Sequence, residues 1–313
     1  MNEILYTVSD DQTNLRIDKF LSEESEELSR SYIQKIISGG NVSVNDRTVL
    51  KSNHRLKEND RVVICVPENI IPEISAENIP LNILYEDSDI IVINKPKGMV
   101  VHPAAGHYSG TLVNALMYHC SDLSGINGVL RPGIVHRIDK DTSGLLVCAK
   151  NNFAHSYLAD QFKEHSITRS YHAIVCGRSK EKEGIIDAPI GRRTNDRKLM
   201  GINEKNGKRA VTHYRVIAEN EKYSYIECRL ETGRTHQIRV HMAYIHHPVL
   251  GDTVYGGKLS EYKLEGEPLN GQTLHAKKLG FIHPGTKEYM EFDSELPEYF
   301  KKLLNKTGLD INN

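Results

Sequence analysis

The chain has 313 residues, 39% apolar and 26% charged, and a net charge of −1, which is typical of a globular protein with one large or two unequal domains. No apolar run approaches the ~18 residues of a membrane span, and the first residues lack a signal-peptide pattern, so we expect a cytoplasmic protein. The five cysteines are far apart and include no Cys-x-x-Cys pair, which argues against a disulfide framework or a thiolate zinc site.

The first 70 residues are predicted to form one small unit. Apolar residues in 15–21 have helical spacing, and a second helix is expected from Ser29 to the glycine pair Gly39–Gly40. Short strands are predicted at 42–44 and 61–66. The segment that follows contains three prolines between Pro67 and Pro80, so we expect residues 71–80 to be a linker.

A larger, strand-rich domain is predicted for residues 81–313. Its expected strands are 89–94, 171–175, 210–218, 224–230, 273–282 and 288–292, and its expected helices are 153–162, 235–245 and 297–304. Strands and helices do not alternate regularly, as they would in a doubly wound fold. The expected class is therefore α+β, with a mixed, mostly antiparallel sheet and a central cleft.

The segment GIVHRIDKDTSG, residues 133–144, places five ionisable side chains between two apolar runs. An ionic turn without chemistry is the simplest interpretation. A kinase-like catalytic loop is a poor match, because Ile138 separates Arg137 from Asp139 and no Gly-rich loop accompanies it. A metal site built from His136, Asp139 and Asp141 lacks further histidines at ligand spacing.

Three more polar stretches distinguish this segment from a plain ionic turn. RSYHAIVCG (169–177) places Tyr171 at the head of a strand. GRTHQIRVHMAYIHHPVLGDTVYG (233–256) is too polar for an ordinary core helix and is followed by turn signals, and LHAKKLGFIHP (274–284) alternates polar and apolar residues.

With these residues the chain resembles the RluA family of RNA pseudouridine synthases. Residues 136–144 match its signature His-Arg-Leu-Asp-x-x-Thr-Ser-Gly, with Ile138 for the usual leucine. The match continues through Tyr171 and the two later stretches, and it covers nearly all of residues 81–292. Separately, residues 14–66 resemble an S4 domain, a small RNA-binding module.

The resemblance implies a reaction and an essential carboxylate. Uridine is isomerised when its N1 glycosidic bond breaks, the uracil turns, and C5 is joined to the ribose. This reaction needs no redox step or external donor, so no metal or organic cofactor is expected. The family's essential aspartate maps to Asp139, which must be ionised to act as a nucleophile or as a base, and both routes stay open.

The resemblance also implies roles for neighbouring residues. An ionised carboxylate in a dry pocket needs a cation, and the match makes this Arg234. Tyr171 should stack on the target base, and Ile238 should pack near the uracil. Arg137 should fill the space left by the flipped base and contact Asp139.

Simpler structural interpretations remain for several of these residues. His136 is grouped with the substrate-binding residues by its place in the signature, although we favour structural roles for it and for His236. Without the family, Tyr171 would be a half-buried strand tyrosine and Arg234 a surface ion pair.

Two basic patches predict contacts with an RNA backbone. Residues 29–61 hold seven Lys and Arg against three Asp and Glu, and residues 192–215 hold eight against two. Ordinary solvated surface is the alternative. The expected RNA-binding residues are Arg16, Arg30, Lys35, Arg47, Arg192, Arg193, Arg197 and Lys198.

The expected partner is structured RNA. Ribosomal RNA of the large subunit, or a pre-ribosomal particle, is the favoured target from the layout of the chain, and transfer RNA is the next. We expect no membrane association and no obligate protein partner. The competing class of function is a non-catalytic RNA-binding or ribosome-assembly factor, which the intact Asp139, Tyr171 and Arg234 disfavour.

Overall fold

The computed structural model describes residues 2–25, 30–66, 74–103, 108–126, 131–193, 195–196, 198–256, 262–264 and 266–309. The chain divides into two compact units, Met1–Pro72 and Glu73–Asn313. Within the described residues, no helix is long and apolar enough to cross a membrane.

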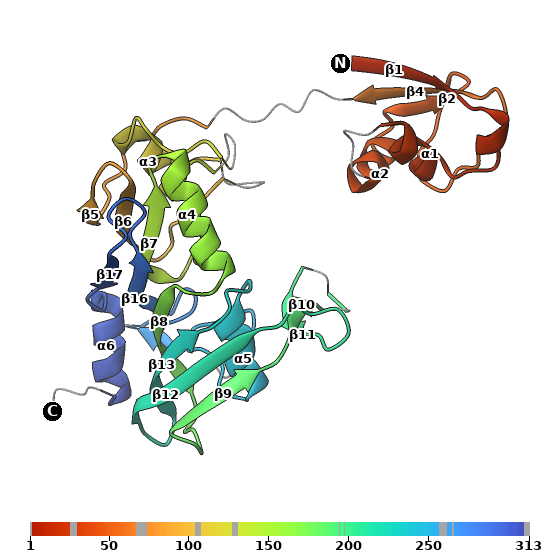
Figure 1. Cartoon of the computed structure of the whole chain (residues 1–313). Helices are drawn as coiled ribbons and strands as arrows, with labels where there is room; N and C mark the ends of the chain where they lie inside the picture. Colours follow the sequence, from red (N-terminus) through yellow and green to blue (C-terminus); the bar gives the residue numbers. More distant parts are fainter. Residues whose placement is uncertain are drawn as a thin grey trace. The chain divides into compact units, whose positions relative to one another are not determined.

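The N-terminal unit packs two helices on a small antiparallel sheet (Figure 1). Its strands, in the order β1-β4-β2-β3, are β1 (Asn2–Thr7), β4 (Arg61–Val66), β2 (Val42–Val44) and β3 (Arg47–Thr48). The helices are α1 (Ile17–Glu24) and α2 (Arg30–Ser38). Ile17, Phe20 and Leu21 of α1 are fully buried against aliphatic residues of α2 and the sheet, so the helical spacing of the sequence marks the core. Ser29 lies outside the described residues.

The second unit is built on a nine-stranded sheet with the order β5-β6-β7-β16-β8-β13-β12-β9, in which β17 also pairs with β16. The strands are β5 (Ile83–Glu86), β6 (Ile90–Lys95), β7 (Ser143–Ala149), β8 (Thr168–Cys176), β9 (Glu183–Asp187), β12 (Val211–Glu219), β13 (Tyr223–Leu230), β16 (Leu274–Ile282) and β17 (Tyr289–Asp293). The β7–β16 pair is parallel and the other pairs of this sheet are antiparallel, which confirms the expected α+β class.

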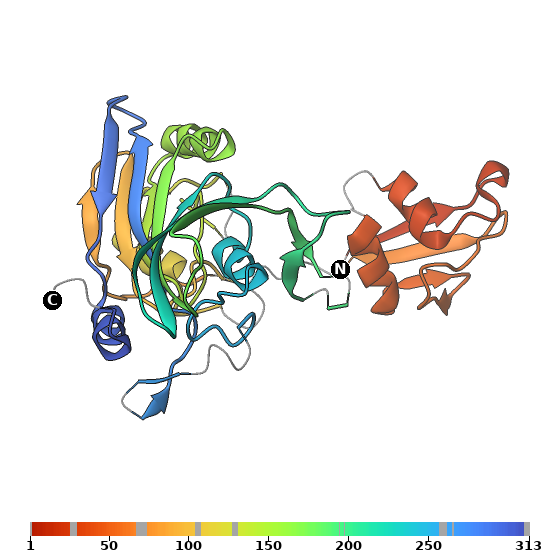
Figure 2. The same ribbon diagram turned by 90° about the horizontal axis from the view of Figure 1, so that it is seen from below.

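Helices cover both faces of this sheet. The helices are α3 (Leu112–His119), α4 (Asn152–Lys163), α5 (Gln237–Tyr244) and α6 (Glu298–Thr307). Residues of α3 and α5 share one core with Tyr171 and Ala173 of β8, whereas α6 packs on Ile174, which points to the opposite face. Figure 2 shows α4, α5 and α6 packed around the curved sheet.

Strand β7 is buried along its whole length, since Leu146 and Cys148 face the core with α3 while Leu145 and Val147 face the core with α4. Gly144 begins this run with φ +111°, and a Cβ there would lie 2.2 Å from the Ala276 carbonyl oxygen. A glycine is therefore required where β7 meets β16. This contact fixes the end of the loop that carries Asp139.

The linker prediction needs correction. Residues 67–73 lie outside the described residues, but residues 74–80 belong to the second unit. Ile74 is buried in the core with α3, and the Glu77 N–H donates to the Asn114 carbonyl at 2.9 Å. The acids and prolines of the segment suggested a linker, yet the buried Ile74 and the hydrogen bonds to Asn114 dock it on the second unit.

The basic segment 192–215 is partly ordered into strands. β10 (Ile190–Arg192) and β11 (Met200–Ile202) pair as an antiparallel ribbon, and β12 begins at Val211. A second small ribbon, β14 (Lys263–Leu264) with β15 (Glu267–Pro268), follows α5. The apolar residues before His136 are not a strand, since Ile134 makes only an isolated bridge to Cys148.

Candidate active site

Asp139 lies in the loop that leads directly into β7. The Thr142 N–H donates to the Asp139 carbonyl oxygen at 3.1 Å, which closes a tight turn. Gln272 Nε2 donates to the Thr142 hydroxyl at 3.0 Å, and both of these side chains are buried. The loop is therefore fastened to the residues that lead into β16.

Lys95 holds the same loop through hydrogen bonds to backbone carbonyl groups. Its side chain is fully buried, and its Nζ donates to the carbonyl oxygens of Pro96, Met99 and Lys140 at 2.8, 2.9 and 3.0 Å. Burial lowers the pKa of Lys95 to about 7, although nearby carboxylates act in the opposite direction. The backbone that follows Asp139 is thus held by groups that make no contact with its carboxylate.

The carboxylate of Asp139 is paired with Arg239 of α5. Arg239 Nη1 donates to Asp139 Oδ2 at 2.8 Å, while Nε and Nη2 hold both oxygens of Asp252 at 2.7 and 2.9 Å. Burial alone would lower the pKa of Arg239, but the hydrogen bonds and charge of Asp252, and then of Asp139, raise it above its ordinary value. A permanently charged guanidinium therefore bridges the two carboxylates.

This geometry corrects the prediction for Arg234, because the cation paired with Asp139 is Arg239. Arg234 lies just before α5, and its Nε donates to the Arg209 carbonyl oxygen at 3.0 Å. Its side chain still lines the cavity beside Asp139. Arg234 is therefore placed at the rim of the site, where it can face a substrate.

A signal for Arg239 was present in the sequence. The residue lies among Ile238, Val240 and Met242, all of which are buried in α5. An arginine inside such a run needs a partner, because an unpaired buried charge is costly. Asp252, in the turn after α5, supplies that partner.

Asp139 separates two cavities that together form the cleft. The smaller cavity, of about 60 Å³, is lined by Tyr171, Leu230, Ile238 and Leu274 in addition to Asp139. The larger, of about 370 Å³, lies on the other side and is lined by polar residues that include Asp141, Asp252, Thr253 and Gln272. Arg137, Ile138, Asp139, His236 and Arg239 border both.

Tyr171 and Ile238 form an apolar wall opposite the carboxylate. Tyr171 is 9% exposed on β8, and Ile238 is 4% exposed at the start of α5. Burial raises the pKa of the Tyr171 phenol, so this ring stays neutral at physiological pH. The structure thus brings Asp139, Tyr171 and Ile238 together as the sequence analysis expected, while their roles toward a substrate are proposals.

Arg137 and His136 point to different surroundings. Arg137 is exposed and borders both cavities. His136 instead stacks on Phe162 of α4, with ring centroids 4.4 Å apart, and its Nε2 accepts a hydrogen bond from the Val147 N–H at 3.1 Å. Burial lowers the pKa of His136 to about 3, so the ring is neutral. The grouping of His136 with substrate-binding residues is therefore corrected to a structural role behind the loop.

Comparisons with known proteins agree with this geometry. A family model for RNA pseudouridylate synthases matches residues 89–244, and an S4 domain model matches residues 15–62. An uncharacterised RNA pseudouridine synthase of Bacillus subtilis is 51% identical over 304 residues, which are 97% of this chain and 98% of the relative. The chain belongs to the RNA pseudouridine synthase family.

Other relatives extend the comparison. The ribosomal large subunit pseudouridine synthase D of Zymomonas mobilis is 48% identical over 312 residues, 98% of each chain. The structure of human RNA pseudouridylate synthase domain containing 1 matches with a TM-score of 0.57 and 28% identity, over 71% of this chain and 86% of that one. The predicted family and S4 domain are confirmed, and the chain is an enzyme that isomerises uridine to pseudouridine in RNA.

Two of the basic residues expected to bind RNA in the S4 domain of this synthase have a structural partner. Asp18 is fully buried, and it accepts hydrogen bonds from Arg16 and Arg30 at 3.0 Å and from Gln34 at 2.8 Å. Burial raises the pKa of Asp18, but these partners outweigh it and hold the pKa below its ordinary value. Arg16 and Arg30 therefore join α1 to α2, although each remains half exposed.

The other basic residues of the S4 domain are more accessible. Lys35 and Arg47 are both exposed. A groove of about 800 Å³ runs along β2 and β3 and is lined by the basic side chains of Arg47, Lys51, Arg55 and Lys57. This groove is the strongest candidate for phosphate contacts in this domain.

In the catalytic unit of the synthase, the β10–β11 ribbon carries the remaining basic residues. Arg192 and Lys198 are exposed, and Arg192 Nη1 donates to the Lys198 carbonyl oxygen at 3.3 Å. Arg193 is also exposed, and its Nε donates to the Met200 carbonyl oxygen at 3.1 Å. Arg197 lies outside the described residues.

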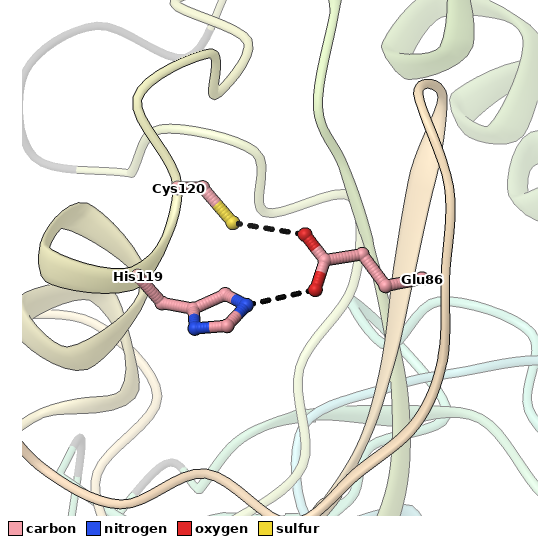
Figure 3. A group of neighbouring side chains, drawn as sticks. All are labelled: Glu86, His119 and Cys120. Carbon is pink, nitrogen blue, oxygen red and sulfur yellow. Dashed lines mark hydrogen bonds and ion pairs between the residues drawn. The ribbon is translucent and has the colours of Figure 1, made fainter.

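One cluster away from the cleft has the residue types of a metal site. Glu86 of β5 lies beside His119 and Cys120 at the end of α3 (Figure 3). Both carboxylate oxygens of Glu86 already have partners, His119 Nε2 at 2.7 Å and Lys150 Nζ at 2.8 Å. Burial also raises the pKa of the Cys120 thiol to about 11. We therefore assign this cluster to ion pairing between β5, α3 and the residue after β7.

Proposed function

We propose that this synthase acts on uridine in large-subunit ribosomal RNA and that Asp139 is its catalytic carboxylate. The observation that carries the proposal is the pairing of Asp139 with a buried arginine at the mouth of an apolar cavity. The ribosomal target is supported by relatives that are named ribosomal large subunit pseudouridine synthase D and are 42–48% identical over most of the chain.

The proposed chemistry is an isomerisation with no change in composition. The N1–C1′ bond of uridine breaks, the C5–C1′ bond forms, C5 loses its proton and N1 gains one. Asp139, ion-paired with Arg239, acts at the ribose either as a nucleophile or as a base. The charge-assisted hydrogen bond from Arg239 Nη1 fixes one carboxylate oxygen, Oδ2, so the hydrogen bonds of Arg239 leave Oδ1 open.

The surrounding residues bind and protect the detached base in this proposal. Tyr171 offers a ring on which uracil can stack, and Ile238 covers its edge. Arg137, exposed at the rim, contacts the RNA from which the target nucleotide has flipped. The apolar wall excludes water, which would otherwise release free uracil and leave an abasic site.

The target is tested by mapping pseudouridine in total RNA from a strain that lacks the gene. Carbodiimide labelling followed by primer extension should show pseudouridines missing from large-subunit ribosomal RNA and regained with the wild-type gene. Sites missing only from transfer RNA would contradict the ribosomal target. An unchanged map would contradict the proposed substrate altogether.

The S4 domain should supply affinity and placement but no chemistry. Deletion of residues 1–72, which ends at the boundary between the two compact units, should leave a soluble enzyme that modifies short uridine-containing RNA. Its affinity for structured ribosomal RNA should fall, and the salt slope should become shallower by about 0.9 for each duplex phosphate that the S4 domain neutralises in the full-length enzyme.

Binding titrations at several salt concentrations, beside activity on a short RNA, measure both effects. A matched deletion of residues 1–80 should be insoluble or unstable, because it also removes the buried Ile74. Unchanged affinity and salt slope after deletion of residues 1–72 would mean that the groove of the S4 domain is ordinary solvated surface.

A further inference from the structure

The cavity beside Tyr171, where the uracil is proposed to bind, is lined by side chains from several elements. Its volume is about 60 Å³. A uracil ring enters this cavity more readily if one of these side chains can turn aside. Tyr171 and Leu274 are fixed in the sheet, and Arg239 is fixed by Asp252. His236, by contrast, is half-buried, lies outside the sheet and borders both cavities.

His236 is held by one neighbour in an unusual conformation. It precedes α5 with φ 57° and ψ 24°, in the left-handed region that residues other than glycine seldom adopt. Its Nδ1 lies 2.6 Å from the Tyr255 hydroxyl, and its Nε2 lies 3.7 Å from Asp139 Oδ1. The ring therefore points one nitrogen at the carboxylate oxygen that Arg239 leaves open, and it stops short of a hydrogen bond.

The hydroxyl of Tyr255 determines which nitrogen of His236 carries the proton. This hydroxyl accepts a hydrogen bond from the Met200 N–H at 3.3 Å, so its own proton is available for His236 Nδ1. In this tautomer the Nε2–H faces Asp139. The other tautomer would point the Nε2 lone pair at a carboxylate, which is unfavourable. Burial lowers the pKa of His236 even though Asp139 opposes this, so the ring is a neutral donor.

The other end of this chain of contacts lies on the β10–β11 ribbon. Met200 begins β11, and the ring of Tyr255 lies between two guanidinium groups, with Arg239 at 5.0 Å and Arg193 at 5.6 Å from its centroid. A groove of about 630 Å³, lined by Tyr244, Tyr255 and Arg193 among others, separates the ribbon from α5. An RNA phosphate bound to Arg193 would thus act on Tyr255, which holds His236.

We propose that Tyr255 is a positioning residue through which RNA contact with the β10–β11 ribbon sets the orientation of His236 beside Asp139. Docking of the RNA moves the ribbon, the Tyr255 hydroxyl follows Met200, and His236 turns to admit the base and to donate to Asp139 Oδ1. This role rests on the proposed function, in which Asp139 is the catalytic carboxylate. In this proposal, the cleft reaches its catalytic arrangement only when RNA is bound.

The test removes the hydroxyl and keeps the ring. With enzyme in saturating excess over RNA, Tyr255→Phe should lower the single-turnover rate about tenfold, the effect expected for one lost hydrogen bond in a charged network. The Kd for RNA should stay unchanged. Tyr118→Phe, the same chemical change at an exposed position of α3 outside this groove, should retain the wild-type rate. A wild-type rate for Tyr255→Phe would overturn the proposal, as would a loss confined to Kd.

A double-mutant cycle tests whether Tyr255 acts through His236. In a His236→Ala background, Tyr255→Phe should cause no further loss, whereas independent, multiplicative losses would contradict action through His236. Arg193→Met, an exposed substitution that should fold normally, should lower the rate at saturating RNA as well as the affinity. A change in affinity alone would overturn the link to the ribbon.

Asp139→Asn measured in parallel separates the positioning role from the catalytic assignment. An active Asp139→Asn enzyme would contradict the catalytic assignment itself. An inactive Asp139→Asn enzyme beside a fully active Tyr255→Phe enzyme would contradict the positioning role alone.

Discussion

Replacement of Asp139 by asparagine should abolish pseudouridine formation and leave the fold intact. The two side chains have the same shape, so the change removes only the charge and the nucleophilic or basic oxygen. We expect a rate loss of at least about 10⁴-fold, the scale seen when one member of a catalytic group that works as a unit is removed. Stability should change little, because Arg239 keeps its two hydrogen bonds to Asp252.

The measurement is release of tritium from RNA labelled at C5 of uridine, since C5 loses its hydrogen when it bonds to the ribose. RNA affinity and thermal unfolding are recorded beside it. Asp141→Asn is the matched control, because it removes a charge two positions along the same loop and should keep measurable turnover. Turnover by Asp139→Asn near the level of this control would remove Asp139 from the catalytic role.

The fold and the position of the site were largely predictable from the sequence, because their signals are local. The strand at 274–282 and the charged loop before a fully buried β7 follow from hydrophobic pattern and turn residues. Helix α3 was missed, since its first five residues, Asn114 included, are all buried, and a helix without an exposed polar face there shows no amphipathic period. Its N-terminal cap, Thr111, was the available sign.

The pairing of Asp139 was harder to predict, because it depends on contacts between distant segments. Arg234 and Arg239 lie five residues apart in one polar stretch, and only the start of α5 at Gln237 decides which of them points inward. The same holds for Arg16 and Arg30, whose charge suggested RNA but whose partner is the buried Asp18. Charge in a sequence indicates a need for a partner, and tertiary structure determines which partner.

Replacement of Arg239 by methionine should have a second large effect, on stability as well as on activity. It leaves Asp252, whose side chain is 1% exposed, without its bidentate partner, and it leaves Asp139 without its cation. Removal of one partner from a buried ion pair typically costs about 3–5 kcal/mol. Urea denaturation should show this loss in the free energy of unfolding, and turnover should fall at temperatures where the variant is still folded.

Two companion variants separate charge from geometry and decide between the two arginines. Arg239→Lys should recover part of the stability but little of the activity, because one ammonium group cannot donate to both carboxylates in the planar arrangement of a guanidinium. Arg234→Met should keep the free energy of unfolding within about 0.5 kcal/mol of wild type, as substitutions away from buried networks do. The opposite result would be a destabilised, inactive Arg234→Met beside an Arg239→Met that behaves as wild type. The ion pair with Asp139 would then belong to Arg234, and the side chains assigned to the cavity beside Tyr171 would be wrong.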